Sequence, residues 1–266
     1  MTKLLNHINT YADLTAFNND MGKDFPNISY IQGTDEVKWN KYDPYPRVIA
    51  KYNVTSTSEE TKLLYVNNSN IKQEIIDGII QDTVKNTYTF DTLGEHIVEY
   101  ELNDTTYLGQ NMFEDCKSLT SVFIPNTVTT YKDQIFKSCS NLSSVSLSHN
   151  CKTISSEMFA RCSSLTNISL PNDLLYINDN FAFYGCTSIE KIIIPDTIIS
   201  IGHYAFGNCT SLTSITVLAT TPPTLSPMYV FDNTNNCPIY VPAESVDAYK
   251  TARGWSTYAD RIQSIS

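Results

Sequence analysis

The fold is decided by the stretch Phe113-Glu114-Asp115-Cys116-Lys117-Ser118-Leu119-Thr120-Ser121-Val122-Phe123-Ile124. Its apolar pattern, Phe-x-x-Cys-x-x-Leu-x-x-Val-x-Ile, returns four more times with conservative changes, at intervals of 23, 23, 24 and 23 residues. A period of about 20 to 50 residues is typical of a solenoid. One repeat cannot bury its own apolar edge, so neighbouring repeats stack and share a core. The sequence therefore predicts five regular rungs, followed by an irregular sixth rung around Phe231 and Cys237.

Equivalent side chains of stacked rungs should lie above one another, which predicts a buried phenylalanine column and a buried cysteine column. Their members are Phe113, Cys116, Phe136, Cys139, Phe159, Cys162, Phe183, Cys186, Phe206 and Cys209. A buried free cysteine behaves as a small hydrophobe. The Cys-x₂₋₄-Cys spacing of a zinc site does not occur. A structural column is therefore preferred to a metal site or to disulfides, and reduced thiols suit a protein assembled in a cytosol.

The rung that begins Ile201-Gly202-His203-Tyr204-Ala205-Phe206-Gly207-Asn208-Cys209 shows the repeat most clearly. It resembles the BspA-like (type 5) leucine-rich repeats, whose typical rung reads I-x-x-x-A-F-x-x-C-x-x-L-x-x-I-x-I-P. The resemblance covers residues 105–242, and its motif is specific. It implies a solenoid used for binding or scaffolding, because the family is found on bacterial surfaces, in protists and in phages.

The chain is predicted to have three parts. Residues 105–266 form the leucine-rich-repeat domain and end in a helical cap at 243–266. Residues 46–104 read as short β-strands, and Tyr88–Tyr100 resembles the closing hairpin of an immunoglobulin-like or PKD-type sandwich. We expect this small domain to cap the first rung, because an open solenoid end exposes core and a strand edge. The expected fold class is mainly β: a solenoid preceded by a small β-sandwich-like domain and an N-terminal arm, residues 1–45.

The N-terminal arm begins with apolar residues at the spacing of a helix. They are Leu4, Ile8, Tyr11, Leu14 and Phe17. This helix either packs on the β-domain, docks on another chain, or is a frayed end. It is followed by residues 26–39, where two alternating stretches flank Gln32–Glu36 and predict a hairpin. That hairpin resembles N-terminal segments of virion and prophage proteins of gut Bacteroides phages, including the crAss-like group, which implies docking on a particle.

Charge and motif content exclude several function classes. The net charge is −10 at pH 7, and such a surface repels phosphate backbones, so we expect no nucleic-acid partner. No apolar run is long enough to span a membrane, and the first residues lack the apolar core of a signal peptide. The four histidines lie in different segments, and no catalytic or phosphate-binding motif occurs. The sequence predicts a protein that is not an enzyme and needs no cofactor or metal.

The remaining candidate is the solvent side of the predicted strands. Residues that alternate with the buried positions project outward from the sheet. They are Ser121, Phe123, Ser144, Ser146, Asn167, Ser169, Lys191, Ile193, Ser214 and Thr216. This strand face is mostly hydroxyls with two apolar islands, which suits a glycan or another protein; the alternative is that these residues are only solvated.

Three functions are weighed. The first is a structural protein of a phage virion, made in the host cytoplasm, whose residues 1–45 dock on capsid or tail proteins while the solenoid is displayed for host or glycan attachment. The second is a BspA-like adhesin of the bacterial cell surface, and the third is an intracellular interaction module. A homo-oligomer is compatible with each of them.

Overall fold

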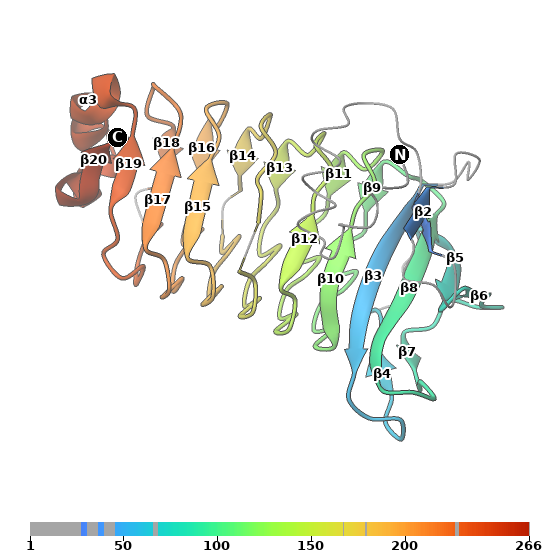
Figure 1. Cartoon of the computed structure of the whole chain (residues 1–266). Coiled ribbons are helices and arrows are strands. Elements are labelled where there is room, and N and C mark those ends of the chain that lie inside the picture. The colour runs from blue at the N-terminus through green and yellow to red at the C-terminus, as the bar shows by residue number, and fades with distance from the viewer. Residues whose placement is uncertain are drawn as a thin grey trace.

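A computed structural model gives the fold of the chain (Figure 1). It describes residues 28–30, 37–39, 46–65, 69–166, 168–178, 180–226 and 229–265. The predicted helical stripe from Leu4 to Phe17, Gln32–Glu36 and Asn167 therefore lie outside the described residues. The two short strands β1 (Ile28–Tyr30) and β2 (Val37–Trp39) pair antiparallel, as expected for the hairpin.

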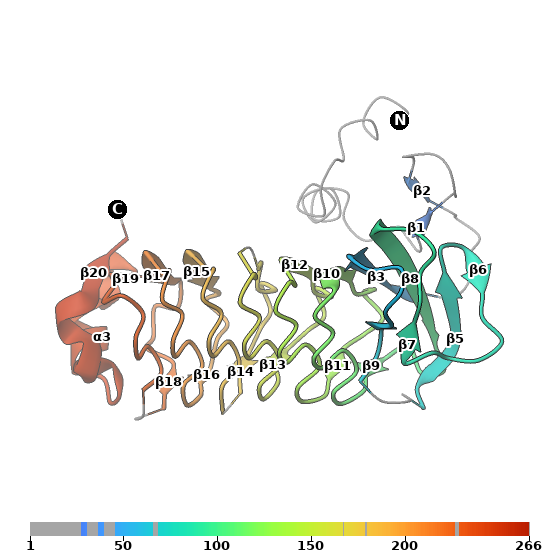
Figure 2. The same ribbon diagram turned by 90° about the horizontal axis from the view of Figure 1, so that it is seen from below.

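The solenoid has two rows of strands that run along opposite faces of the coil, as Figure 2 shows from below. The first row contains β10 (Leu119–Phe123), β12 (Ser144–Ser146), β15 (Lys191–Ile194), β17 (Ser214–Val217) and β19 (Ile239–Val241). The second row contains β9 (Tyr107–Leu108), β11 (Thr130–Tyr131), β13 (Thr153–Ile154), β14 (Tyr176–Ile177), β16 (Ser200–Ile201) and β18 (Thr224–Leu225). Neighbouring strands within each sheet of the solenoid pair in parallel, as successive turns of one coil must. In the third rung, the described residues 165–166 and 168–170 form no strand.

The phenylalanine column is confirmed. The rings of Phe113, Phe136, Phe159, Phe183 and Phe206 are fully buried, and their centroids follow one another at 5.5, 5.4, 5.2 and 5.2 Å in nearly parallel planes. Phe231 continues the column at 5.8 Å, which places the irregular rung in register. The column ends on Tyr100 at one side and Trp255 at the other. Aromatic side chains therefore close both ends of the core.

The cysteine column is also confirmed, and its thiols do more than fill space. All seven cysteines are free and buried. In the second to fifth rungs, the column thiol donates to the carbonyl of the phenylalanine in the preceding rung, from Cys139 Sγ to Phe113 O at 2.8 Å through Cys209 Sγ to Phe183 O at 3.2 Å. Burial raises the pKa of these thiols and keeps them protonated donors. A protonated, buried thiol is a poor nucleophile, so the column is structural and inert.

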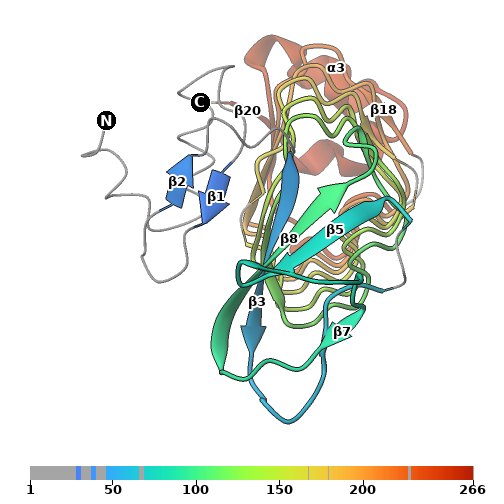
Figure 3. The same cartoon turned by 90° about the vertical axis from the view of Figure 1, so that its right-hand side faces the viewer.

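The small β-domain does not simply abut the solenoid, because the two parts share one sheet. β3 (Arg47–Val54) pairs antiparallel with β10 of the first rung and with β8 (Gly94–Leu102). The sheet has the order β12-β10-β3-β8-β5-β6, where β5 is Ile71–Ile76 and β6 is Ile79–Ile80. Among the described residues of this domain, β4 (Thr61–Lys62) and β7 (Thr87–Tyr88) form a separate two-stranded sheet. Viewed along the solenoid, β8 and β5 lie across the end of the coil (Figure 3).

The C-terminal cap is less helical than expected. Within 243–266, the α-helix α3 covers only Val246–Thr251 between the 3₁₀ turns Ala243–Ser245 and Trp255–Arg261. Residues Ile262–Ser264 then form β20, which pairs in parallel with β19. A strand forms here because the last rung offers an unpaired edge that only another strand can satisfy.

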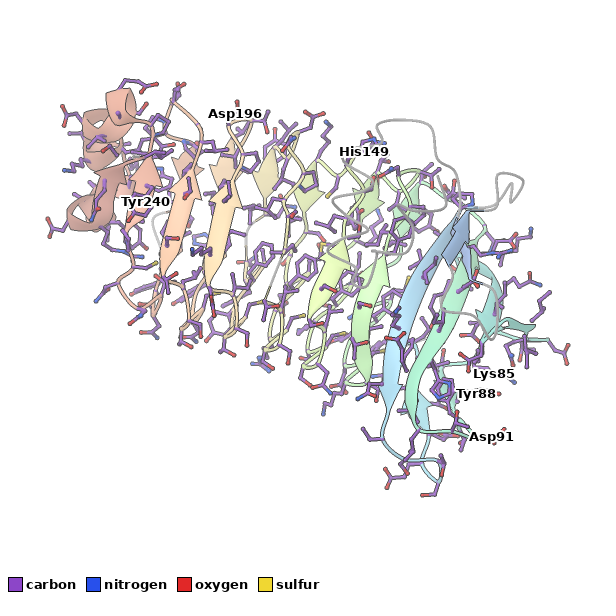
Figure 4. The ribbon with its side chains drawn as sticks, viewed as in Figure 1. Lys85, Tyr88, Asp91, His149, Asp196 and Tyr240 are labelled. Carbon is purple, nitrogen blue, oxygen red and sulfur yellow. The ribbon has the colours of Figure 1, made fainter. Side chains whose placement is uncertain are left out.

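A buried carboxylate lies on β5. Glu74 is 1% exposed; one of its carboxylate oxygens accepts a bond from the Lys85 backbone N–H at 2.8 Å. The other, Oε1, has no hydrogen-bond partner among the described residues. Burial raises the pKa of Glu74 to about 7, against the opposing effect of the Lys85 bond. Lys85 marks this corner of the β-domain in Figure 4.

Glu74→Gln is expected to stabilise the protein at pH 8 and not at pH 4. The raised pKa means that the folded state holds the proton more tightly than the unfolded chain, whose value is near 4.5. Wild-type stability therefore falls as the pH rises from about 4.5 through about 7. The amide removes that loss, which we expect to be about 3 kcal/mol. Urea unfolding at both pH values measures it, with the exposed Glu59→Gln as control. A Glu74→Gln effect that is equal at pH 4 and pH 8 would refute this assignment.

Candidate binding surface

The strand face is built by alternation along each rung strand. In β15, Ile192 and Ile194 point into the core, while Lys191 and Ile193 are exposed. The parallel register carries the outward positions from rung to rung, so that Lys191 lies beside Ser214 and Ile193 beside Thr216. In the first two rungs Ser121 lies beside Ser144, and Phe123 lies beside Ser146. The face therefore consists of two columns of side chains that run along the solenoid.

The members of the strand face differ in exposure. Lys191, Ile193 and Ser169 are exposed, and Ile193 is the most prominent apolar member at 60%. Phe123, Ser144, Ser146, Ser214 and Thr216 are half-buried. Ser121 is buried at 6%, between Lys51 of β3 and Ser144 of β12. Ser121 was expected to be available on the outward face. It lies instead at the junction with the β-domain, where a ligand has little access to its side chain.

Two sets of hydroxyls have different uses. The first set consists of hydroxyls at the start of a rung strand, which donate to a backbone carbonyl of the preceding rung. Ser143 donates to Thr120 O at 3.0 Å, and Thr213 donates to Glu190 O at 2.9 Å. Thr120 similarly donates to Lys51 O at 3.1 Å. The outward set, by contrast, makes no side-chain hydrogen bond within the described residues. These hydroxyls belong to Ser144, Ser146, Ser214 and Thr216. They keep their full hydrogen-bonding capacity for an external partner.

Sequence analysis missed Tyr240 as a member of this face. Tyr240 lies on β19 beside Thr216 and is followed on β20 by Gln263, and Figure 4 shows it on the strand side near the C-terminal cap. The irregular sixth rung hid it, because the spacing from Phe231 to the strand differs from that of the regular rungs. The sequence Ile239-Tyr240-Val241, with its apolar–aromatic–apolar alternation, was the available signal.

His96 pairs with a carboxylate but is not open to solvent. His96 contacts Asp77 at 2.7 Å and Thr92 at 3.3 Å, but the residue is only 7% exposed, and its ring centroid lies 4.1 Å from that of Phe90. These contacts hold the turn before β8. His149 and Asp196 lie near one edge of the solenoid (Figure 4). In the described part of the chain, no three His, Cys, Asp or Glu side chains are placed to hold a metal ion.

The described residues also contain no helix long and apolar enough to cross a membrane. The strand face offers a hydroxyl-rich surface on a stack of paired strands. Its chemistry is that of recognition through hydrogen bonds and apolar contacts.

The fold and this surface define a leucine-rich-repeat solenoid. The family model "BspA type Leucine rich repeat region" matches residues 83–181 and 179–252 in six copies, and the chain belongs to that family. The family prediction made from the repeat is therefore confirmed. No curated protein sequence matches the chain.

Solved structures with similar regions carry the same kind of repeat. A leucine-rich cell surface protein from Faecalibacterium prausnitzii is 32% identical, with 42% of this chain and 29% of that chain covered and a TM-score of 0.41. The leucine-rich-repeat protein of T. pallidum is 23% identical over 51% and 62% of the two chains, with a TM-score of 0.45. A leucine-rich-repeat protein from Bacteroides ovatus is 19% identical over 61% and 49%, with a TM-score of 0.41. The matched regions thus span less than two thirds of each of these proteins.

Proposed function

We propose that this protein is a non-enzymatic binding protein that attaches to a larger assembly through residues 1–45 and displays its solenoid outward. The observation that carries the proposal is the shared sheet, in which β3 of the β-domain pairs with β10 of the first rung. A continuous sheet resists hinge motion between the two parts, so the strand face keeps a fixed orientation relative to the β-domain. Its unbonded outward hydroxyls and the exposed Ile193 supply the recognition chemistry.

The assembly we favour is a phage particle. The support is the hairpin segment of residues 26–39, with its resemblance to virion proteins, together with the apolar stripe that precedes it. The second candidate is a bacterial cell-surface adhesin, which membership of the BspA-type family favours. Both candidates use the same solenoid and differ in what the N-terminal residues hold.

Fractionation of the producing cells distinguishes the two settings. If the protein belongs to a virion, quantitative mass spectrometry of purified particles finds it at a fixed copy number per particle. If it is a surface adhesin, it is found in the cell envelope and is digested when protease is added to intact cells. Its presence only in the free cytosolic fraction would contradict the proposal.

The docking role of the N-terminal stripe has a matched test. Ile8→Asp/Leu14→Asp places two charges on the apolar stripe, and Asn9→Asp/Ala16→Asp places them on the opposite side of the same predicted helix. We expect the first pair to abolish association with the assembly and the second to leave it unchanged. Equal association of both double variants would show that the stripe does not dock.

A further inference from the structure

A second aromatic column lies outside the core, two residues before the core phenylalanine of each later rung. Phe181 stacks on Tyr204 with centroids 5.1 Å apart, and Tyr204 stacks on Tyr229 at 5.1 Å. Phe181 and Tyr204 are half-buried, and Tyr229 is 51% exposed. In the first three rungs the same position holds Asn111, Gln134 and Glu157, whose side chains bond to one another in sequence. The fold therefore accepts polar residues here and does not require the aromatic ones.

The backbone makes these aromatic residues costly. Phe181, Tyr204 and Tyr229 have φ values of 62°, 50° and 55°, in the left-handed region that bulky residues rarely adopt. The turn imposes this conformation in every rung, since Asn111, Gln134 and Glu157 have φ values of 60°, 63° and 52° at the same position. Polar residues fill this position in the first three rungs, so the turn does not need the aromatic rings, and their exposed surface is open to a ligand.

The outer column is held rigidly. Tyr184 packs edge-on against Phe181 at 5.1 Å and against Tyr204 at 6.2 Å. Gly207 leaves the space for this contact, because a Cβ there would lie 3.1 Å from both Tyr184 and Tyr204. Asn208 donates to the Tyr184 hydroxyl at 2.5 Å and accepts from Asn233 at 2.8 Å. Tyr229, the last ring, thus has one face fixed against Tyr204.

Beyond Tyr229 the column stops and a hollow of about 680 Å³ begins, between the last rung and the cap. Its lining includes Tyr229, Asp232, Asn233, Asn235, Asn236 and Tyr258. Asp232 and the three asparagines are exposed. Asp232 lies close to two tyrosines, since its carboxylate contributes, after burial, to the raised pKa of both Tyr204 and Tyr258.

Arg261 fixes the far wall of the hollow. Its guanidinium donates to Cys237 O at 2.8 Å and to the Thr234 hydroxyl at 2.9 Å, and it lies 5.4 Å from the Tyr258 ring centre. The Arg261 guanidinium is therefore already engaged in hydrogen bonds within the protein. The groups left to a ligand are one aromatic face, one carboxylate and several amides, which together can accept and donate hydrogen bonds but carry negative charge.

This combination selects a class of ligand. A pyranose ring presents C–H groups on its flat face, which pack on an aromatic face, and hydroxyls at its rim, which bond to carboxylates and amides. An anionic ligand is disfavoured by Asp232 and by the net charge of −10. We propose that the hollow beside Tyr229 binds a neutral sugar residue of a glycan, with the ring stacked on Tyr229 and its hydroxyls bonded to Asp232 and the neighbouring asparagines. This site is distinct from the strand face and does not depend on how residues 1–45 attach.

The test uses the full chain on an array of neutral pyranose oligosaccharides from host mucins and bacterial polysaccharides, followed by titration calorimetry with the strongest binder. We expect Tyr229→Ala and Asp232→Asn each to weaken binding about tenfold or more, because each removes a principal contact. Tyr229→Phe keeps the ring and should stay within about threefold of the wild type. Tyr176→Ala, an exposed tyrosine on another rung, is the control and should bind as the wild type does.

Each alternative result overturns the proposal. If no oligosaccharide on the array binds, neutral sugars are excluded as the ligand. Binding that survives Tyr229→Ala but is lost in Ile193→Ser assigns the glycan to the strand face. Binding of apolar peptides, and of no oligosaccharide, assigns the hollow to a protein partner. In all three cases, association of the chain with particle or envelope is measured separately, so failure here leaves the proposed attachment intact.

Discussion

Phe159→Ala is expected to lower the free energy of unfolding by about 3–5 kcal/mol, the range for removing a fully buried phenylalanine. Phe159 is 0% exposed and lies in the middle of the column, with Phe136 at 5.4 Å and Phe183 at 5.2 Å. Both neighbours are held by their own rungs, so neither can move to fill the void. The solenoid depends on contacts between adjacent rungs, and the loss should therefore weaken the whole array.

Urea denaturation followed by circular dichroism measures this loss. The matched control is Phe123→Ala, which removes the same side chain from a half-buried position on the strand face and should cost about 1 kcal/mol or less. If the two variants are equally stable, the phenylalanine column is not the core of the molecule.

Trp255→Ala is expected to cost about 3–5 kcal/mol and to cause aggregation. Trp255 is fully buried, its indole N–H donates to Pro223 O at 2.8 Å, and it packs on Phe231 at 5.9 Å and on Tyr249 at 4.9 Å. Its removal uncovers the end of the phenylalanine column and leaves a buried carbonyl without that donor. An uncapped solenoid end exposes apolar surface that other molecules can bury.

Thermal denaturation and light scattering of the purified variant test the role of the cap. Tyr240→Ala removes an aromatic side chain of the same end from the outward face and should leave both the melting temperature and solubility nearly unchanged. A Trp255→Ala protein that melts with the wild type and stays monomeric would show that the C-terminal cap does not protect the core.

The repeated part of the chain could be predicted in detail because each rung repeats the same physical problem. Phe113 and Cys116 each have counterparts at every later regular rung, so their burial and stacking follow from the period alone. The hydrogen bond from the thiols of the second to fifth rungs to a phenylalanine carbonyl was not predictable, because it depends on the turn geometry. The outward position of Ser121 was correct in direction, but its burial depends on β3, which lies outside the repeat.

Junctions and ends were harder to predict because they have no period. The antiparallel pairing of β3 with β10 joins segments far apart in sequence. The alternation of apolar and polar residues in Arg47–Val54 predicts a strand but does not indicate which strand it pairs with. Residues Ile262–Ser264 became a strand because β19 offered an edge, although the preceding residues favour a helix. The outer column of Phe181, Tyr204 and Tyr229 was visible as aromatics at one repeat position. The hollow at the end of this column was not visible in the sequence, since its position depends on where the C-terminal cap folds back.

The central claim is that the β-domain and the solenoid form one continuous sheet, and an engineered disulfide tests it most directly. Lys51 and Ser121 are opposite each other across β3 and β10, where Cα atoms of antiparallel partners lie about 4.5–5.5 Å apart, within disulfide range. Lys51→Cys/Ser121→Cys should therefore cross-link nearly completely under mild oxidation. Lys51→Cys/Ser144→Cys, one strand further and about 10 Å apart, should stay reduced. Absence of the first cross-link, or equal formation of both, would contradict the shared sheet.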